Sequence, residues 1–179
     1  MKVQVLIGNI VKQPDIDAIV NSANANLRMG SGVAGAIHTA AGPKLEEYCR
    51  PFAPLELGCA LITPGFLLPN RWIIHVRAAH YINNIEPERY LALAISALLT
   101  TARDNQIKSI ALPAIGTGVF KFPAELAAAI TAKTISQHSK ISTEIQLIRI
   151  CVASEDLAEA YRDAFERELN EVPLAYDLG

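Results

Sequence analysis

The chain has few cysteines and no long apolar segment. Its 179 residues include three cysteines, Cys49, Cys59 and Cys151. Their number is odd, and they are far apart in the sequence, each among apolar neighbours. This pattern predicts buried, reduced thiols rather than disulfides, because disulfide frameworks use paired cysteines in oxidising compartments. No stretch approaches the roughly 18 to 20 apolar residues of a transmembrane helix, and the apolar run from Val3 lacks the cleavage pattern of a secretory signal. We therefore expect a cytoplasmic protein without membrane contacts.

An excess of basic charge is also absent. The formal net charge is −2 and the isoelectric point is near 6.1. Nucleic-acid binding depends mainly on Lys and Arg that neutralise phosphates, so this balance makes a polynucleotide partner unlikely. A zinc site is not expected either, because His75 and His80 lie five residues apart with no cysteine or carboxylate at ligand spacing.

Two glycine-rich turns are present, Gly-Ser-Gly-Val at 30–33 and Gly-Thr-Gly-Val at 116–119. Each follows an expected strand and precedes an expected helix. Glycine permits φ > 0 and has no Cβ to block a ligand, so successive N–H groups can converge on an anion that a helix N-terminus also attracts. Neither turn has the Gly-Lys-Ser/Thr sequence of a nucleoside-triphosphate loop. Two such turns instead predict a diphosphate site.

The glycine spacing at 30, 32 and 35 also matches the G-x-G-x-x-G pattern of dinucleotide-binding folds. That pattern requires an acidic residue at the end of a strand about 20 residues later. The acids in this region, Glu46 and Glu47, fall in a helical segment, and the segment before the turn is rich in asparagine. Hydride transfer is therefore disfavoured.

Apolar runs alternate with helical patterns along the chain. Helical spacing of apolar residues extends over 91–102 and 157–169, with Ser154 as an expected N-cap. This alternation predicts an α/β protein, a three-layer α/β/α sandwich with a mixed, mostly parallel sheet. With 51% hydrophobic residues, one core is expected, so we predict a single domain over 1–170 and a C-terminal tail over 171–179 that Tyr176 and Leu178 could anchor. The expected strands are 3–7, 18–20, 59–62, 72–76, 109–113 and 145–152.

Four sequence segments together resemble the macrodomain family, of the type that binds ADP-ribose or processes Appr-1″-p. They are DAIVNSAN at 17–24, GSGVAGAIHTAAG at 30–42, GCALITPG at 58–65 and LPAIGTGVF at 112–120. The likeness extends over about residues 3 to 170. It implies the fold and strand order of that family, and ADP-ribose as the ligand.

The resemblance implies a role for each residue that matches a family motif. Asn24 would hydrogen-bond the distal ribose beside the scissile bond, and Phe120, rather than Phe122, would lie over that ribose. Asn9 stands where the family has an aspartate that accepts a hydrogen bond from the adenine amino group, and a neutral acceptor would reduce adenine affinity by about 1 kcal/mol. The other implied ligand contacts are Ile10, Asn21, Gly30, Ser31, Gly32, Val33, Gly116, Thr117, Gly118 and Val119.

Each of these residues also has a purely structural alternative. An asparagine at the end of a strand can cap a turn, as Asn24 or Asn9 would, and an aromatic residue at the end of a loop can fill the core. We assign Asn26 to the structure of its loop and Lys121 to solvent.

Ala34 departs from one hydrolase branch of the family, in which an aspartate proposed to activate water follows the Gly-Val pair. His38, one helical turn further, carries a titratable imidazole, although a histidine in a helix is more often structural. With no carboxylate at position 34, we expect substrate assistance. Water between the Ala34 main chain and an oxygen of the ligand's diphosphate would attack the distal ribose or its ester, and orientation alone can contribute roughly 7 to 11 kcal/mol.

The sequence supports two functions, and it supports a third less well. The first is hydrolysis of ester-type ADP-ribose linkages, in mono-ADP-ribosylated proteins or in O-acetyl-ADP-ribose. The second is a reader that binds ADP-ribose without turnover, and the third is an RNA or poly(A) module, which the acidic isoelectric point disfavours. None of them requires a metal or a cofactor.

Overall fold

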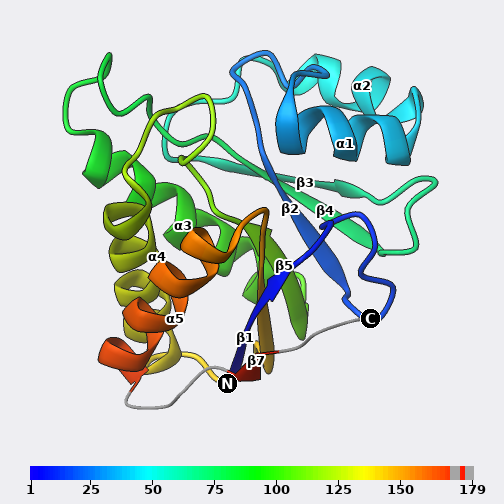
Figure 1. Cartoon of the computed structure of the whole chain (residues 1–179). Helices are drawn as coiled ribbons and strands as arrows, with labels where there is room; N and C mark the ends of the chain where they lie inside the picture. The colour runs from blue at the N-terminus through cyan, green and yellow to red at the C-terminus, as the bar shows by residue number, and fades with distance from the viewer. Residues whose placement is uncertain (170–173, 176–179) are drawn as a thin grey trace.

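A mixed seven-stranded sheet forms the middle layer of the molecule (Figure 1). The computed structural model describes residues 1–169 and the main chain of 174–175. The strand order is β3-β4-β2-β5-β6-β1-β7, and every neighbouring pair is parallel except β3 with β4. The strands are β1 (Lys2–Ile7), β2 (Ala18–Ser22), β3 (Ala60–Pro64), β4 (Trp72–Val76), β5 (Ser109–Pro113), β6 (Leu147–Val152) and β7 (Leu174–Ala175).

Helices cover both faces of this sheet (Figure 1). On one face, α3, α4 and α5 bury their apolar stripes against the strands, and on the other face the smaller layer of α1 and α2 does the same. The predicted three-layer α/β sandwich is confirmed. The helices are α1 (Gly32–Ala41), α2 (Lys44–Cys49), α3 (Pro87–Asp104), α4 (Ala124–Ser139) and α5 (Glu155–Leu169), with a short 3₁₀ turn at Arg50–Phe52.

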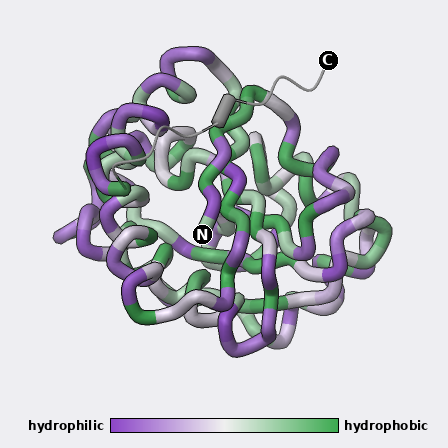
Figure 2. The backbone as a smooth tube through the Cα atoms, turned by 90° about the horizontal axis from the view of Figure 1, so that it is seen from below, coloured by the Kyte–Doolittle hydropathy of each residue, from purple (hydrophilic) through white to green (hydrophobic). Residues whose placement is uncertain are grey.

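The central strands are apolar on both sides because helices cover both faces. Ala18, Ile19 and Val20 of β2 are fully buried, with Ile19 in one apolar cluster and its two neighbours in the other. Figure 2 shows hydrophobic segments concentrated in the middle of the molecule and hydrophilic segments at its periphery. Among the described residues, no helix is long and apolar enough to cross a membrane.

Helix ends follow the chemistry of the sequence. Pro87 occupies the first turn of α3, where a missing N–H costs nothing. The Ser154 hydroxyl accepts a hydrogen bond from Leu157 N at 3.4 Å, which makes it the N-cap of α5 as predicted. The expected strands are all present, with boundaries shifted by two residues at most.

Two expectations need correction. All three cysteines are free, but only Cys49 and Cys151 are buried, whereas Cys59 is exposed because it sits in the turn that leads into β3. The second glycine turn does not adjoin a helix N-terminus, since β5 ends at Pro113 and α4 begins only at Ala124.

The C-terminal segment adds a short edge strand. Leu174 pairs with Gln4 of β1, and Ala175 pairs with Val5. Tyr176 and Leu178, the predicted anchors, lie outside the described residues. The division into a domain at 1–170 and a tail at 171–179 stays a prediction.

Candidate functional site

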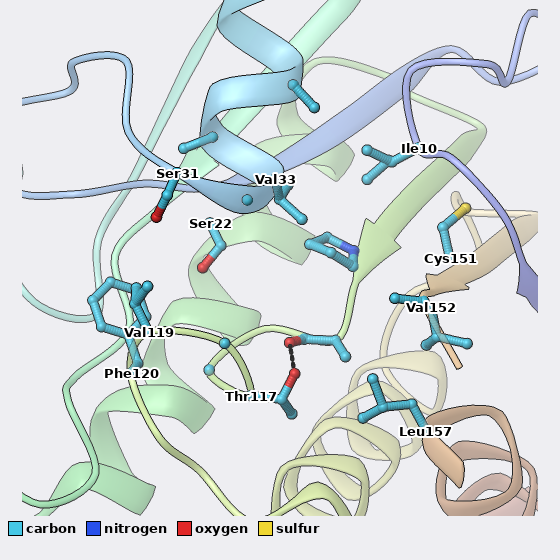
Figure 3. Close-up of a pocket in the computed structure, with 18 of the residues that line it drawn as sticks. Ile10, Ser22, Ser31, Val33, Thr117, Val119, Phe120, Cys151, Val152 and Leu157 are labelled. Atoms are coloured by element: carbon cyan, nitrogen blue, oxygen red, sulfur yellow. Dashed lines mark hydrogen bonds between the residues drawn. The ribbon is translucent and has the colours of Figure 1, made fainter. Parts of the chain in front are cut away.

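A cavity of about 490 Å³ opens at the carboxyl ends of the parallel strands (Figure 3). This is the edge at which open α/β sheets bind ligands. Loops after β1, β2, β5 and β6 all contribute to its wall. The lining residues are Gly8, Asn9, Ile10, Ser22, Ser31, Gly32, Val33, Ala34, Ala36, Pro113, Ala114, Gly116, Thr117, Gly118, Val119, Phe120, Cys151, Val152, Ala153 and Leu157.

The first glycine turn leads directly into helix α1. Ser31 is the N-cap residue, and its side chain makes no capping hydrogen bond. The N–H groups of Gly32, Val33 and Ala34 have no acceptor among the described residues, as expected for the first turn of a helix. These donors lie at the positive end of the helix dipole, so this wall of the cavity attracts an anion.

Gly35 allows this turn to lie close against its helix. A Cβ at this position would come within 2.5 Å of the Gly30 carbonyl oxygen, which is shorter than any tolerated contact. Gly32 has φ +58°, in the left-handed region that favours glycine. The conformation of the turn is therefore set by glycine at both positions.

The second glycine turn is held by its own hydrogen bonds. Thr117 donates to the Ala114 carbonyl oxygen from both its hydroxyl, at 2.8 Å, and its main-chain N, at 3.2 Å. Phe122 N donates to Gly116 O at 2.9 Å, and Gly116 has φ +91°. The N–H groups of Gly116, Gly118, Val119 and Phe120 have no acceptor in the part of the chain that the structure describes.

Phe120 and Phe122 take different places. Phe120 lines the cavity, whereas Phe122 is buried beneath Gly116, with its ring 5.0 Å from that of Tyr81. The main-chain oxygen of Phe120 accepts a hydrogen bond from Tyr81 N at 2.7 Å, which fixes the end of the turn. The contact of Phe120 with a ribose stays a prediction.

Asn24 and Gly30 are absent from the cavity lining. The Asn24 amide closes a local loop, since its Nδ2 donates to Arg28 O at 2.8 Å and its Oδ1 accepts from Arg28 N at 3.2 Å. Gly30 lies beside this amide. The predicted ribose contact of Asn24 would have to use the remaining hydrogen and lone pair of the amide.

Asn21 and His38 are turned away from the cavity into a buried polar cluster with His75. Asn21 Nδ2 lies 3.0 Å from His75 Nδ1, and His75 Nε2 lies 3.1 Å from Thr63 Oγ1. Burial lowers the pKa of His75 to about 3 and also lowers the pKa of His38. The structure therefore does not bring Asn21 to the ligand site, and His38 is not placed to transfer a proton there. The His38 ring, on α1, lies beside that of His75 on β4, with 6.4 Å between the ring centroids.

Ser22 takes the place in the cavity wall that the sequence had assigned to Asn21. Successive side chains of a strand point to opposite faces, and Ser22 follows Asn21 at the end of β2. The alternation of side chains along β2 was the signal that could have shown which of the two residues lines the cavity.

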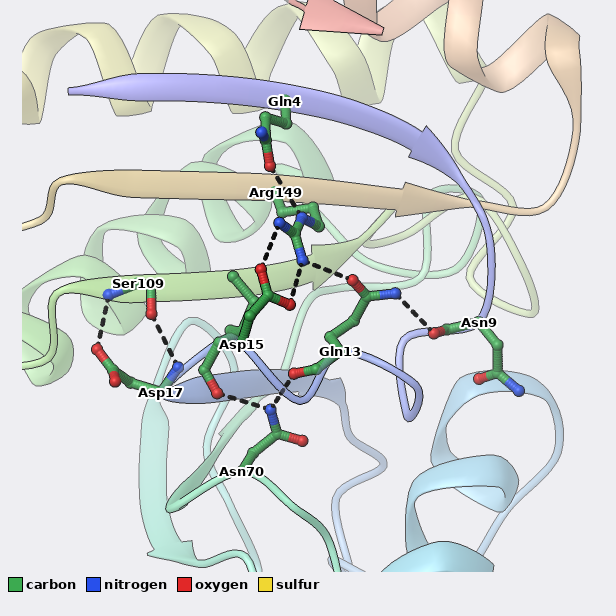
Figure 4. Close-up of polar contacts among 9 residues, drawn as sticks. Gln4, Asn9, Gln13, Asp15, Asp17, Asn70, Ser109 and Arg149 are labelled. Atoms are coloured by element: carbon green, nitrogen blue, oxygen red, sulfur yellow. Dashed lines mark hydrogen bonds and ion pairs between the residues drawn. The ribbon is translucent and has the colours of Figure 1, made fainter. Parts of the chain in front are cut away.

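Asn9 lies beside a buried polar network that sequence reasoning missed (Figure 4). Its neighbour Ile10 lies across the cavity from Phe120 (Figure 3). Gln13 Nε2 donates to Asn9 O at 3.0 Å, and Gln13 Oε1 accepts from Arg149 Nη1 at 2.8 Å. Arg149 also binds both carboxylate oxygens of Asp15 at 2.8 Å and Gln4 Oε1 at 2.9 Å. The Arg149 hydrogen bond lowers the pKa of the Asp15 carboxyl.

Comparison with known proteins identifies the family. The chain matches the Macro domain over residues 20–131. It is 42% identical over 156 residues to a macro domain-containing protein of Ralstonia nicotianae, and the match covers 87% of each chain. The chain belongs to the macrodomain family.

Solved macrodomain structures have the same fold. A variant of the Oceanobacillus iheyensis macrodomain with ADPR superimposes with a TM-score of 0.88 at 32% identity, covering 94% of both chains. The same macrodomain with ADP gives a TM-score of 0.86 at 32% identity over 93% of this chain and 92% of that one. Human ADP-ribose glycohydrolase MACROD2 is 42% identical over 142 residues, which are 77% of this chain and 33% of that protein.

The cavity of this macrodomain is almost free of ionisable groups. Among its described lining residues, none carries a carboxylate, an imidazole or a basic side chain. Cys151 is the one thiol, and burial raises its pKa to about 12, so it stays protonated and is a poor nucleophile. The electrostatics of the cavity therefore come from main-chain N–H groups and the α1 dipole.

Proposed function

We propose that this macrodomain binds ADP-ribose in the cavity, with the diphosphate between the two glycine turns. The observation that carries this proposal is a set of main-chain N–H groups that line one cavity and have no acceptor among the described residues. They belong to Gly32, Val33 and Ala34 in the first turn and to Gly116, Gly118, Val119 and Phe120 in the second. Opposed donors from two loops suit a pair of linked phosphates. Related macrodomains have been solved with ADPR and with ADP.

The two ends of the cavity suit the two ends of this ligand. Ile10, Val152 and Leu157 gather at one end, and Val119 and Phe120 lie at the other (Figure 3). In our proposal, the base lies among the aliphatic side chains beside Asn9, and the distal ribose lies against Phe120. The diphosphate then falls between them, at the first turn of α1.

We propose further that the cavity hydrolyses ester-type linkages at the distal ribose by substrate assistance. No general base lines the described cavity, so a diphosphate oxygen would accept the proton as a water held at the Ala34 main chain attacks. An ester of an acidic side chain leaves as a carboxylate, which needs no protonation by a general acid at neutral pH. Asn24 would orient the ribose hydroxyls, and Phe120 would hold the ring.

A reader that binds ADP-ribose without turnover is the second candidate. The lack of a carboxylate, imidazole or amine in the described cavity favours it, because no side chain there is suited to proton transfer. An RNA-binding function remains the weakest candidate, since no Lys or Arg is among the described residues that line the cavity.

Calorimetric titration with ADP-ribose, AMP and NAD in parallel tests the ligand. ADP-ribose should bind most tightly, because only it fills both ends of the cavity with an unsubstituted distal ribose. AMP lacks the second phosphate and should bind more weakly. Equal affinities for ADP-ribose and AMP would contradict a site built around a diphosphate.

Release of label from a mono-ADP-ribosylated protein separates the enzyme from the reader. For a hydrolase, Asn24→Ala should slow release much more than it weakens ADP-ribose binding. The matched control is Asn26→Ala, at an exposed asparagine of the same loop, which should leave both quantities unchanged. Binding without release by the unmodified protein would favour the reader. Affinity for oligo(A) that falls steeply with salt would instead support RNA binding.

A further inference from the structure

The orientation of the Asn9 side-chain amide is determined by the main chain. Its Oδ1 lies 3.1 Å from the main-chain N of Val11. A peptide N–H can only donate, so the amide atom that faces it must be the carbonyl oxygen, and a flipped amide would set two donors against each other. The Nδ2 group therefore points away from Val11. Asn9 lines the cavity, and Nδ2 is the donor of this amide that is left to bind a ligand, because no described residue accepts from it.

A hydrogen bond from the buried Gln13 side chain fixes the main chain at Asn9. Gln13 is 2% exposed and donates to Asn9 O, while its own oxygen accepts from the buried Arg149 guanidinium (Figure 4). Arg149 is anchored in turn by Asp15 and Gln4. This connected network keeps the position of Asn9 independent of the ligand.

The base end of the cavity thus presents hydrogen-bond donors. Asn9 Nδ2 has no acceptor among the described residues, and neither does the Ile10 N–H. The side chains that complete this end, Ile10, Val152 and Leu157, are aliphatic and do not distinguish an amino group from a carbonyl on a purine.

We propose that Asn9 makes this macrodomain accept a purine with an exocyclic carbonyl, as in hypoxanthine, at least as well as adenine. This inference rests on the proposed function and names the base. The two free donors, Asn9 Nδ2 and the Ile10 N–H, match the edge of hypoxanthine on which O6 and N7 are both acceptors. The same edge of adenine has N7 as an acceptor but an amino group in place of O6, so it would leave two donors facing each other. An aspartate at this position would have the opposite preference, because a carboxylate only accepts.

Parallel titrations with adenosine diphosphate (ADP) and inosine diphosphate (IDP) test this inference. The unmodified protein should bind IDP at least as tightly as ADP. Dissociation constants that differ by less than threefold count as equal. Asn9→Asp keeps an acceptor for Val11 N. It should shift the ratio of the two affinities toward ADP by about tenfold, because the carboxylate gains a charge-assisted hydrogen bond from the adenine amino group and the amide's hydrogen bond to the carbonyl of IDP is lost. Asn83→Asp, which adds the same charge at an exposed loop position, should leave the ratio unchanged.

The outcomes separate this inference from the function on which it rests. ADP binding by the unmodified protein that is more than threefold tighter than IDP binding would overturn the inference alone, whether or not the variant folds. An unchanged ratio in a folded Asn9→Asp protein would overturn it as well. If neither nucleotide binds, the proposed function fails and the inference fails with it.

Discussion

Two regions of the cavity, the glycine turns and the end beside Asn9, are built in different ways. In the turns, where we place the diphosphate, the main chain supplies the donors, and glycines at 32, 35 and 116 permit the required conformations. At the proposed base end, a side chain supplies the donor, and a buried network that includes residues of distant strands holds it. A local backbone motif thus makes one region, and long-range side-chain contacts make the other. Substitutions in each region test this difference.

The largest effect is expected at the first glycine turn, for Gly35→Ala. The new Cβ would lie 2.5 Å from Gly30 O, so Gly30 and the start of α1 must move apart, which displaces the N–H donors of the first turn of α1. Overpacking against main chain costs roughly 1–3 kcal/mol, and a loss of about 2 kcal/mol in binding is about 30-fold in Kd. Calorimetry with ADP-ribose measures this change.

Gly8→Ala is the matched control, at a glycine that lines the cavity itself. Its Cβ would lie 3.4 Å from the Leu6 side chain, an ordinary contact, so ADP-ribose affinity should change by less than about threefold. Equal losses in the two variants would contradict the role assigned to the first turn.

The next largest effect is expected at the base end, for Arg149→Met. This change removes hydrogen bonds to Gln4, Gln13 and Asp15, two of which are buried side chains, so we expect a loss of about 2 kcal/mol in the free energy of unfolding. Binding of ADP should weaken, while binding of inorganic pyrophosphate should not. Urea unfolding and calorimetry check the two parts.

Arg103→Met serves as the comparison variant for stability. Arg103 pairs with Asp104 on the surface, where both side chains are about half exposed, so its removal should cost less than about 1 kcal/mol. If the two variants lose equal stability, the network around Arg149 does not have the role described.

A smaller effect is expected for Thr117→Val in the second turn. It removes the 2.8 Å hydrogen bond from the Thr117 hydroxyl to Ala114 O, a loss of about 1 kcal/mol that should weaken ADP-ribose binding by about fivefold. Thr134→Val removes a similar bond to Ile130 O within α4 and should leave the affinity unchanged. Affinity that falls equally in both variants would point to a global effect.

The smallest effect concerns the pH dependence of stability. The pKa of Asp15 is lowered in the folded protein, so its contribution is fully present above the ordinary aspartate pKa of about 3.9 and is lost as pH falls through the lowered value. The Asp15 side chain is 59% exposed, so the contribution should be under about 1 kcal/mol. Urea unfolding between pH 6 and pH 3 should show a shallower loss in Asp15→Asn than in the unmodified protein. Identical slopes would contradict the pairing with Arg149.

The difference between local motifs and long-range contacts also explains which features the sequence could predict. Buried strands and amphipathic helices follow from periodicity, and both glycine turns were recognisable because φ > 0 and close approach leave a local signature. The second turn lies before Pro123, so a helix was expected too early. The face of Asn21 was misjudged, although the period of the strand contained that information.

The network around Asn9 could not be predicted from local sequence. Arg149 and Gln13 are 136 residues apart, and nothing in either neighbourhood indicates the other. An arginine within the apolar run of β6 was the available signal, because a buried charge requires partners. The identity of those partners depends on sheet order, which the sequence alone does not determine.

Amide chemical-shift mapping by NMR with ADP-ribose is the most direct test of the central claim. We expect the largest shifts in both turns together, because their N–H groups without acceptors would bind one diphosphate. The residues concerned are Gly32, Val33, Ala34, Gly116, Gly118, Val119 and Phe120. Saturable binding that shifts the amides of neither turn, or of one turn only, would contradict it.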